Sequence, residues 1–208
     1  MDSLATIEEE IKKCKKCDLW STKRNYVPGD GSENADVVFI GEAPGREEDL
    51  QGKPFVGNAG KLLTEMIEKI GLTRKDVFIG NVLKCRPPNN RDPTPEEIEA
   101  CSPYLIRQLE VIKPKVIVCL GRFSASFIFE LFGLEFTNIS RVRRKVFNVE
   151  RWGKNVSIIA LYHPAAILYR PQLREEYEKE FGVIKDLIGA NKKEKKKIKN
   201  STLLDYFD

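Results

Sequence analysis

The 208-residue sequence lacks any long apolar run and is poor in histidine and methionine. Its longest apolar stretches, such as 116–120 and 156–161, are far too short to cross a bilayer, so no membrane-spanning segment is expected. The first residues, Met1-Asp2-Ser3, do not open a signal peptide, and we expect a soluble, cytoplasmic protein. One histidine and two methionines beside many lysines and glutamates are typical of thermophilic proteins.

An excess of charge of one sign is also missing from most of the chain. The first 190 residues hold 29 basic and 28 acidic side chains, whereas the last eighteen hold six lysines against three acids. This balance permits a polyanionic partner without demanding one. With 41% hydrophobic residues the chain can bury a sizeable core, which excludes general disorder and suits one globular domain.

Four short segments rich in Val and Ile have the pattern of buried strands, and amphipathic helical segments alternate with them. This alternation predicts an α/β fold, a three-layer α/β/α sandwich with a central four-stranded parallel sheet. The domain is expected over 1–190, followed by a lysine-rich flexible tail at 191–208. The strands are expected at 36–40, 76–82, 115–120 and 155–162, and the main helices at 62–70, 95–112, 123–132 and 173–188.

Residues at or directly after the ends of the strands are candidate site residues, because ligands bind at the carboxyl ends of the strands in such sheets. They are Gly41-Glu42-Ala43-Pro44-Gly45, Asn81, Gly121-Arg122 and His163-Pro164. The glycine-rich segments 41–45 and 57–61 lack the spacing of a dinucleotide fingerprint or a P-loop. NAD and ATP are therefore disfavoured as ligands.

Four of the five cysteines suit a metal site. Cys14 and Cys17 form a C-x-x-C pair, and Cys85 and Cys101 follow with fifteen residues between them. Thiolates bind zinc and iron–sulfur clusters alike, and the wide second spacing favours a cluster over a second zinc knuckle. A redox pair, or core thiols at Cys85 and Cys101, are the alternatives. Cys119 lies inside an apolar strand and is expected in the core.

One set of motifs occurs in order along the chain. It comprises C-x-x-C at 14–17, G-E-A-P-G at 41–45, G-K-P-F-V-G-N-A-G at 52–60, N-V-L-K-C-R-P-P at 81–88, Cys101 and H-P-A at 163–165. Together these motifs resemble family 4 uracil-DNA glycosylases, the iron–sulfur branch found in thermophilic archaea and bacteria, over Ile7 to Leu187. The resemblance implies a [4Fe-4S] cluster on Cys14, Cys17, Cys85 and Cys101, and hydrolysis of the N-glycosidic bond of deoxyuridine in DNA.

An enzyme of this kind must extrude the nucleotide and hold the base in a pocket, which Gly41 is expected to border. Phe55 is the expected stacking platform. The Asn81 amide matches uracil N3–H and O4 but not cytosine, so Asn81 is the expected base reader. His163 is expected to stabilise negative charge on uracil O2 as the base leaves. The ordinary alternatives are core packing for Phe55, a turn for Asn81 and a structural role for His163.

The activation of water has the least support from the residues. The best-known uracil glycosylases carry an Asp in the first motif, and Ala43 fills that place here. Glu42 is the nearest acid and is expected to polarise water or to stabilise the oxocarbenium ion. Glu48 is expected either to crowd the 5-methyl group of thymine or to have no role.

Contacts with DNA and with a protein partner are also expected. Arg86 and Arg170 are candidate phosphate contacts, and Leu168 is a candidate wedge in the base stack. The tail resembles a peptide that docks on the replication sliding clamp through Leu203, Tyr206 and Phe207, the alternative being a tail that folds back on the domain. We expect a monomer that works on nucleoid DNA.

Two other functions stay open from the sequence. One is a superfamily relative that removes another deaminated base such as hypoxanthine, against which the Asn81 amide argues because it fits uracil's edge. The other is a clamp-tethered iron–sulfur module that binds DNA or senses redox state without glycosylase activity.

Overall fold

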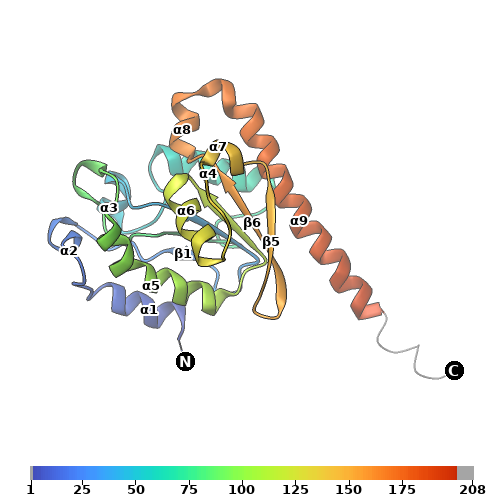
Figure 1. Ribbon diagram of the computed structural model, residues 1–208, viewed down its shortest axis with the longest axis horizontal. Coiled ribbons are helices and arrows are strands. Elements are labelled where there is room, and N and C mark those ends of the chain that lie inside the picture. Colours follow the sequence, from blue (N-terminus) through green and yellow to red (C-terminus); the bar gives the residue numbers. More distant parts are fainter. Residues whose placement is uncertain (1, 201–208) are drawn as a thin grey trace.

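A six-stranded sheet forms the centre of the molecule, in the order β1-β3-β2-β4-β6-β5. The computed structural model describes the backbone of residues 2–200 and the side chains of residues 2–189 (Figure 1). The four inner strands run parallel to one another and confirm the predicted parallel sheet. They are β2 (Val37–Gly41), β3 (Phe78–Asn81), β4 (Val116–Leu120) and β6 (Lys154–Leu161).

The prediction of four strands in total is wrong, because two antiparallel edge strands extend the sheet. β1 (Asp30–Gly31) pairs with β3, and β5 (Val146–Arg151) pairs with β6. β1 has only two residues and no side chain of β5 is fully buried, so neither carries the apolar pattern that marks a buried strand. β5 and β6 form a hairpin whose turn residues, Trp152 and Gly153, both have positive φ.

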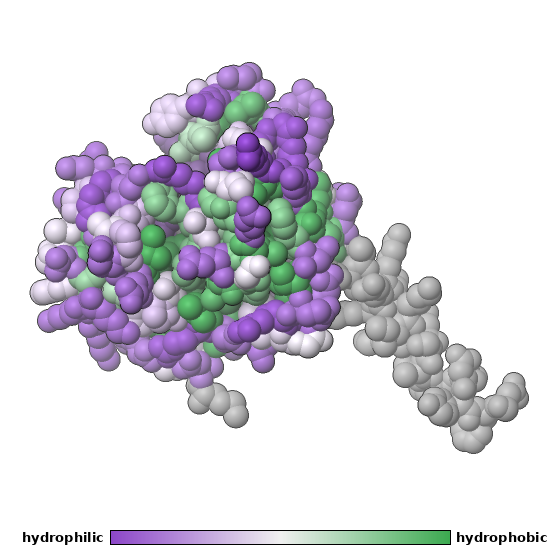
Figure 2. Space-filling model, viewed as in Figure 1, coloured by the Kyte–Doolittle hydropathy of each residue, from purple (hydrophilic) through white to green (hydrophobic). Residues whose placement is uncertain are grey.

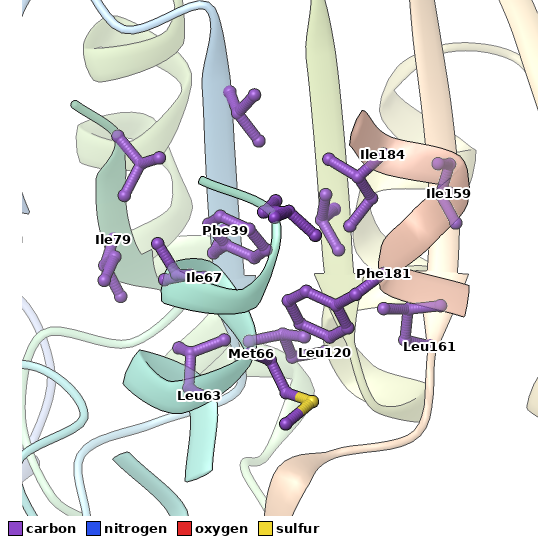
Figure 3. Close-up of a cluster of buried hydrophobic side chains, with 14 of the residues drawn as sticks. Phe39, Leu63, Met66, Ile67, Ile79, Leu120, Ile159, Leu161, Phe181 and Ile184 are labelled. Atoms are coloured by element: carbon purple, nitrogen blue, oxygen red, sulfur yellow. The ribbon is translucent and has the colours of Figure 1, made fainter. Parts of the chain in front are cut away.

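Helices cover both faces of this sheet and confirm the three predicted layers (Figure 1). On one face, α4 (Asn58–Lys69), α8 (Pro164–Tyr169) and α9 (Arg174–Asn200) pack against strand residues that include Phe39. On the other face, α5 (Pro95–Ile112) and α6 (Arg122–Leu131) pack against the alternate residues Val38 and Ile40. Figure 3 shows α4 and α9 placing their apolar side chains over the first face.

The remaining helical elements are short and lie around the ends of the sheet. α1 (Leu4–Ile11) packs against α5, which begins at a capping box formed by Thr94 and Glu97. α2 (Leu19–Thr22), α3 (Arg46–Gln51), α7 (Ile139–Val142) and the two 3₁₀ turns Pro88–Asn90 and Pro171–Leu173 complete the described chain. These short elements carry or border most of the loops that build the site.

The C-terminal helix is longer than the sequence pattern predicts. α9 continues past residue 188 and ends at Asn200, through part of the segment expected as a flexible tail. Residues 190–200 contain neither Gly nor Pro, and the Lys and Glu that fill them favour a helix. Leu203, Tyr206 and Phe207 lie outside the described residues, so the clamp-binding peptide stays a prediction.

The face of the molecule seen in Figure 2 is mainly polar. Figure 2 shows hydrophilic side chains over most of one face, with hydrophobic side chains among them in the area that α6 and β5 occupy in Figure 1. No described helix is both long and apolar enough to span a membrane.

Candidate active site

A cavity of about 300 Å³ opens where the parallel strands end. Its volume lies at the lower limit of the range for small-molecule sites, which suits a small ligand. Eight of the candidate residues named from the sequence line this cavity: Glu42, Ala43, Pro44, Gly45, Glu48, Phe55, Asn81 and His163. Ala59, Pro87, Asn90, Arg91 and Ala165 complete the lining.

Asn81 ends β3 and presents an unusual buried acceptor. Its side chain is only 2% exposed, and among the described residues Oδ1 has no hydrogen-bond partner. A buried acceptor without a partner costs about 1–3 kcal/mol. Gly41 allows this placement, because a Cβ there would lie 2.4 Å from Asn81 Oδ1 and 2.6 Å from Phe55 Cζ. Asn81 therefore has an acceptor available for a ligand that brings its own donor.

His163 borders the same cavity as a neutral imidazole. Burial lowers the pKa of His163 to about 4, against the opposing effect of the Glu48 charge. Its Nδ1 accepts a hydrogen bond from the Ala165 N–H at 3.2 Å, so the ring proton lies on Nε2. The Phe55 ring lies beside it, with the two ring centroids 5.5 Å apart. His163 thus offers an uncharged N–H donor near neutral pH.

Phe55 has a backbone conformation that is rare for a bulky residue. Its φ is 51°, in the left-handed region, and its side chain is buried. Glu48 stabilises the following turn, because its Oε1 accepts hydrogen bonds from the Val56 and Gly57 N–H groups at 2.9 Å each. The structure therefore connects Glu48 with the placement of the Phe55 loop.

Arg74, which the sequence analysis missed, holds the other side of the Phe55 loop. Its guanidinium donates to the Pro54 carbonyl at 2.7 Å and to the Phe55 carbonyl at 3.1 Å. Gly60 permits this turn, because a Cβ there would lie 1.9 Å from the Phe55 oxygen. Gly60 thus makes room for the protein's own backbone. Nothing near Arg74 in the sequence signals its role.

Glu42 follows β2 and is poised to change its charge near neutral pH. Burial is the main cause that raises the pKa of Glu42 to about 7, and the Asp92 charge adds to it while Arg122 opposes it. Asp92 and Arg122 form an exposed ion pair at 2.5 Å. Arg122 follows a predicted strand, whereas no pattern in the sequence marks Asp92. A carboxyl group with this pKa is suited to general-base work.

The residues predicted to contact DNA lie outside the cavity lining. Arg86 donates through Nε to Asn90 Oδ1, at 2.7 Å, and Asn90 lines the cavity. Leu168 is 42% exposed near the end of α8, the short helix that His163 begins, and its neighbour Tyr169 is 87% exposed. Arg170 follows them at the surface. Two exposed large apolar side chains therefore follow one another at the end of the helix that begins at His163.

A second, smaller pocket is lined by Cys14, Cys17, Cys85 and Cys101. The first two lie between α1 and α2, the third follows β3, and the fourth is on α5. All four are free thiols, and Cys119 is fully buried in β4, which confirms the prediction of a core residue.

The surroundings of these four thiols suit a bound metal-containing group, which would hold the cysteines as thiolates. Burial raises the pKa of Cys85 and raises that of Cys101 to about 11, so both would stay protonated without a positive partner. Bound metal ions deprotonate coordinating thiols. The Lys84 N–H already donates to Cys101 Sγ at 3.2 Å, as expected beside a sulfur that carries negative charge.

Comparisons with known proteins agree with this geometry. A sequence model of the uracil DNA glycosylase superfamily matches residues 28–184. A type-4 uracil-DNA glycosylase of Archaeoglobus fulgidus is 66% identical over 99% of this chain and 100% of its own length. A protein of the same name from Saccharolobus solfataricus is 50% identical over 91% of this chain and 88% of its own length. Another, from Thermotoga maritima, is 46% identical over 78% of this chain and 81% of its own length. The chain therefore belongs to the type-4 family of the uracil-DNA glycosylase superfamily.

Proposed function

We propose that this protein removes uracil from DNA by hydrolysing the N-glycosidic bond of deoxyuridine, which leaves an abasic site for base excision repair. The observation that carries this proposal is the buried, unpartnered Oδ1 of Asn81, in a cavity that also holds a neutral histidine. A base cannot react while it is stacked in a duplex, so the deoxyuridine must rotate out into this cavity.

The Asn81 amide reads the extruded base. Oδ1 accepts from uracil N3–H, and the amide NH₂ donates to uracil O4. Cytosine presents the reverse pattern at both positions, so it would leave the buried oxygen unpaired. Phe55, held in its strained conformation, supplies a flat apolar surface for the base. The same amide also argues against a hypoxanthine-specific enzyme.

His163 assists bond cleavage by stabilising the leaving base. As the glycosidic bond breaks, negative charge develops on uracil O2 and positive charge on the sugar. A neutral Nε2–H donates to that oxygen without first losing charge or changing tautomer, and one such donor is worth about 3–4 kcal/mol. His163 is therefore an oxyanion stabiliser and not a general base.

We assign the activation of the attacking water to the carboxyl group of Glu42. Above its raised pKa it is a carboxylate, which accepts a proton from attacking water and stabilises positive charge on the sugar. Glu48 Oε1 accepts hydrogen bonds from two backbone N–H groups of the Phe55 loop, so we propose that Glu48 positions this loop. Its role in excluding the methyl group of thymine stays a prediction.

The exposed side chains around the cavity hold the DNA. Leu168, with Tyr169 beside it, fills the gap that the extruded nucleotide leaves in the stack. Arg86 and Arg170 contact phosphates, which orient the strand without reading its sequence.

The four cysteines hold a [4Fe-4S] cluster in this proposal. Such a cluster would cross-link the α1–α2 connection, the segment after β3 and helix α5, and its contribution is structural. Among the described side chains, no group of three or more His, Cys, Asp or Glu is arranged to hold a single metal ion. A [4Fe-4S] cluster is held by four cysteine thiolates, and the four cysteines that line this one pocket supply that number.

Base release from oligonucleotides tests the function directly. Strands with U opposite G, U opposite A, unpaired U, hypoxanthine or T are incubated with protein and then cleaved with alkali at abasic sites. We expect cleavage only of the uracil strands, and Asn81→Ala should slow it roughly 10²–10³-fold. Asn34→Ala, at an exposed asparagine, is the control and should match the wild type. Cleavage of only the hypoxanthine strand, or of none, would reject the proposal.

The ionisation of His163 is open to measurement because it is the only histidine. An NMR titration of its ring should show a pKa of about 4 and a proton on Nε2 at neutral pH, since burial disfavours the charged ring. A pKa near the ordinary 6.5 would remove the argument for a neutral donor. His163→Ala should lose roughly 10²–10³-fold in single-turnover rate.

The pH profile of kcat/KM tests Glu42. The carboxylate is the active form, so the rate should rise as the pH passes through about 7 and then level off. His163 stays neutral over this interval and adds no inflection. Glu42→Gln should lower the rate and remove the inflection. An inflection near pH 7 that persists in Glu42→Gln would assign it to another group.

Metal analysis tests the cluster. Protein purified without oxygen should be brown and contain about four irons and four acid-labile sulfides per chain. Cys17→Ser should lose iron and unfold at a lower temperature, whereas Cys119→Ser should keep its iron because Cys119 lies outside the pocket. Colourless protein with one zinc ion per chain would overturn the cluster assignment.

A further inference from the structure

Lys84 is a buried lysine that the proposed reaction does not use. It lies between Asn81 and Cys85 in the chain and is 1% exposed. Lysine is almost never fully buried unless its ammonium is paired, because removing the charge from water costs several kcal/mol. An apolar residue of similar size would fill the same space without that cost, so packing alone does not explain it.

The ammonium of Lys84 contacts Asn81, the proposed base reader. Nζ donates to the backbone carbonyl of Asn81 at 2.8 Å and to Gln108 Oε1 at 2.8 Å. Gln108 is 2% exposed on α5, and its Nε2 donates to the Pro28 carbonyl at 2.9 Å. The lysine therefore joins the backbone of Asn81 to two separate parts of the fold.

The backbone of Lys84 contacts Cys101, one of the four cysteines of the second pocket. Its N–H donates to Cys101 Sγ at 3.2 Å, and its carbonyl accepts from the Val27 N–H at 2.8 Å. The two residues before it extend the pairing toward β2, because Val82 N–H donates to the Gly41 carbonyl and Leu83 N–H to the Glu42 carbonyl, both at 3.0 Å. The whole segment between the two pockets is thus held by hydrogen bonds.

This arrangement matters because no group among the described residues donates a hydrogen bond to the Asn81 acceptor. The direction of its side chain then depends on the backbone of Asn81 and on packing against Gly41. We propose that Lys84 is a positioning residue: by holding the Asn81 carbonyl, it fixes the amide in the orientation that reads uracil. This inference rests on the proposed function and adds a residue to it.

Lys84→Met tests the proposal, since it keeps the apolar stem and removes the ammonium. Three quantities are measured well below the unfolding temperature: inhibition by free uracil, the single-turnover rate of uracil release, and affinity for DNA with an abasic site. We expect uracil affinity and the rate of uracil release to fall roughly ten- to a hundredfold, because the Asn81 amide loses its alignment with the hydrogen-bonding groups of uracil. Affinity for abasic DNA and the iron content should stay within about twofold, because the DNA surface and the cysteines remain in place.

Lys115→Met is the matched control. Lys115 is also largely buried, with a side chain 15% exposed, and its ammonium pairs with Asp36 at 2.8 Å just before β4, at the opposite end of the strands from the cavity. It should lose stability without losing uracil affinity. A purely structural role for Lys84 would make the two variants alike, with normal uracil affinity and rate in the folded protein, and would overturn the proposal.

Gln108→Met decides the question if Lys84→Met does not fold. It removes the acceptor that anchors the ammonium on the side away from Asn81, so the hydrogen bond to the Asn81 carbonyl should loosen and uracil affinity should fall by roughly three- to tenfold. Unchanged affinity would overturn the proposal. The wild-type protein separates this inference from the proposed function: if it neither releases nor binds uracil, the function fails, whereas normal wild-type activity with unaffected variants rejects only the role of Lys84.

Discussion

The parallel alignment of β3, β2, β4 and β6 is the constraint on which the site depends. Asn81, Glu42 and His163 are far apart in the sequence, yet each lies at or just after the carboxyl end of a strand, and these ends share one edge of the sheet. Parallel neighbours require long crossovers, and the helices that make them cover both faces and bury the strands. The same connections that build the core thus bring the polar side chains together.

Desolvation in the cavity acts on Glu42 and on His163 in the same way. It disfavours the charged form of each group, which lowers the pKa of His163 and raises that of Glu42. The result is a neutral histidine in the same pocket as a carboxyl group whose pKa lies near neutral pH. A neutral N–H donor then gains most of its binding energy when negative charge develops on the leaving base.

Local strain and an unpaired acceptor are both concentrated at this edge of the sheet. The left-handed backbone of Phe55 persists because Glu48 and Arg74 bind the loop from two sides. The buried Oδ1 of Asn81 persists because Lys84 and Gly41 leave its residue little freedom. Each costs stability that the large two-sided core offsets, and each fits a pocket that is arranged before its ligand arrives.

The order of residues along the chain was enough to determine the class of fold and the members of the site. Buried strands separated by amphipathic helices have few packing solutions, and residues after strand ends are brought together in all of them. Glu42, Asn81 and His163 were therefore accessible from sequence, and so was the set of four cysteines, whereas Phe55, in the loop between α3 and α4, was reached through the family resemblance. The edge strands β1 and β5 were not, because the first has only two residues and neither side of the second is fully buried.

Only the tertiary structure decided how these residues are held and charged. Arg74, Lys84 and Gln108 act through hydrogen bonds to residues 3 to 80 positions away, so no local pattern marks them. The tautomer of His163 depends on its position as the cap of α8, and the pKa of Glu42 depends on its burial. Sequence determines which chemical groups are available, whereas burial and long-range hydrogen bonds determine the state in which each one works, because both arise only when distant segments pack together.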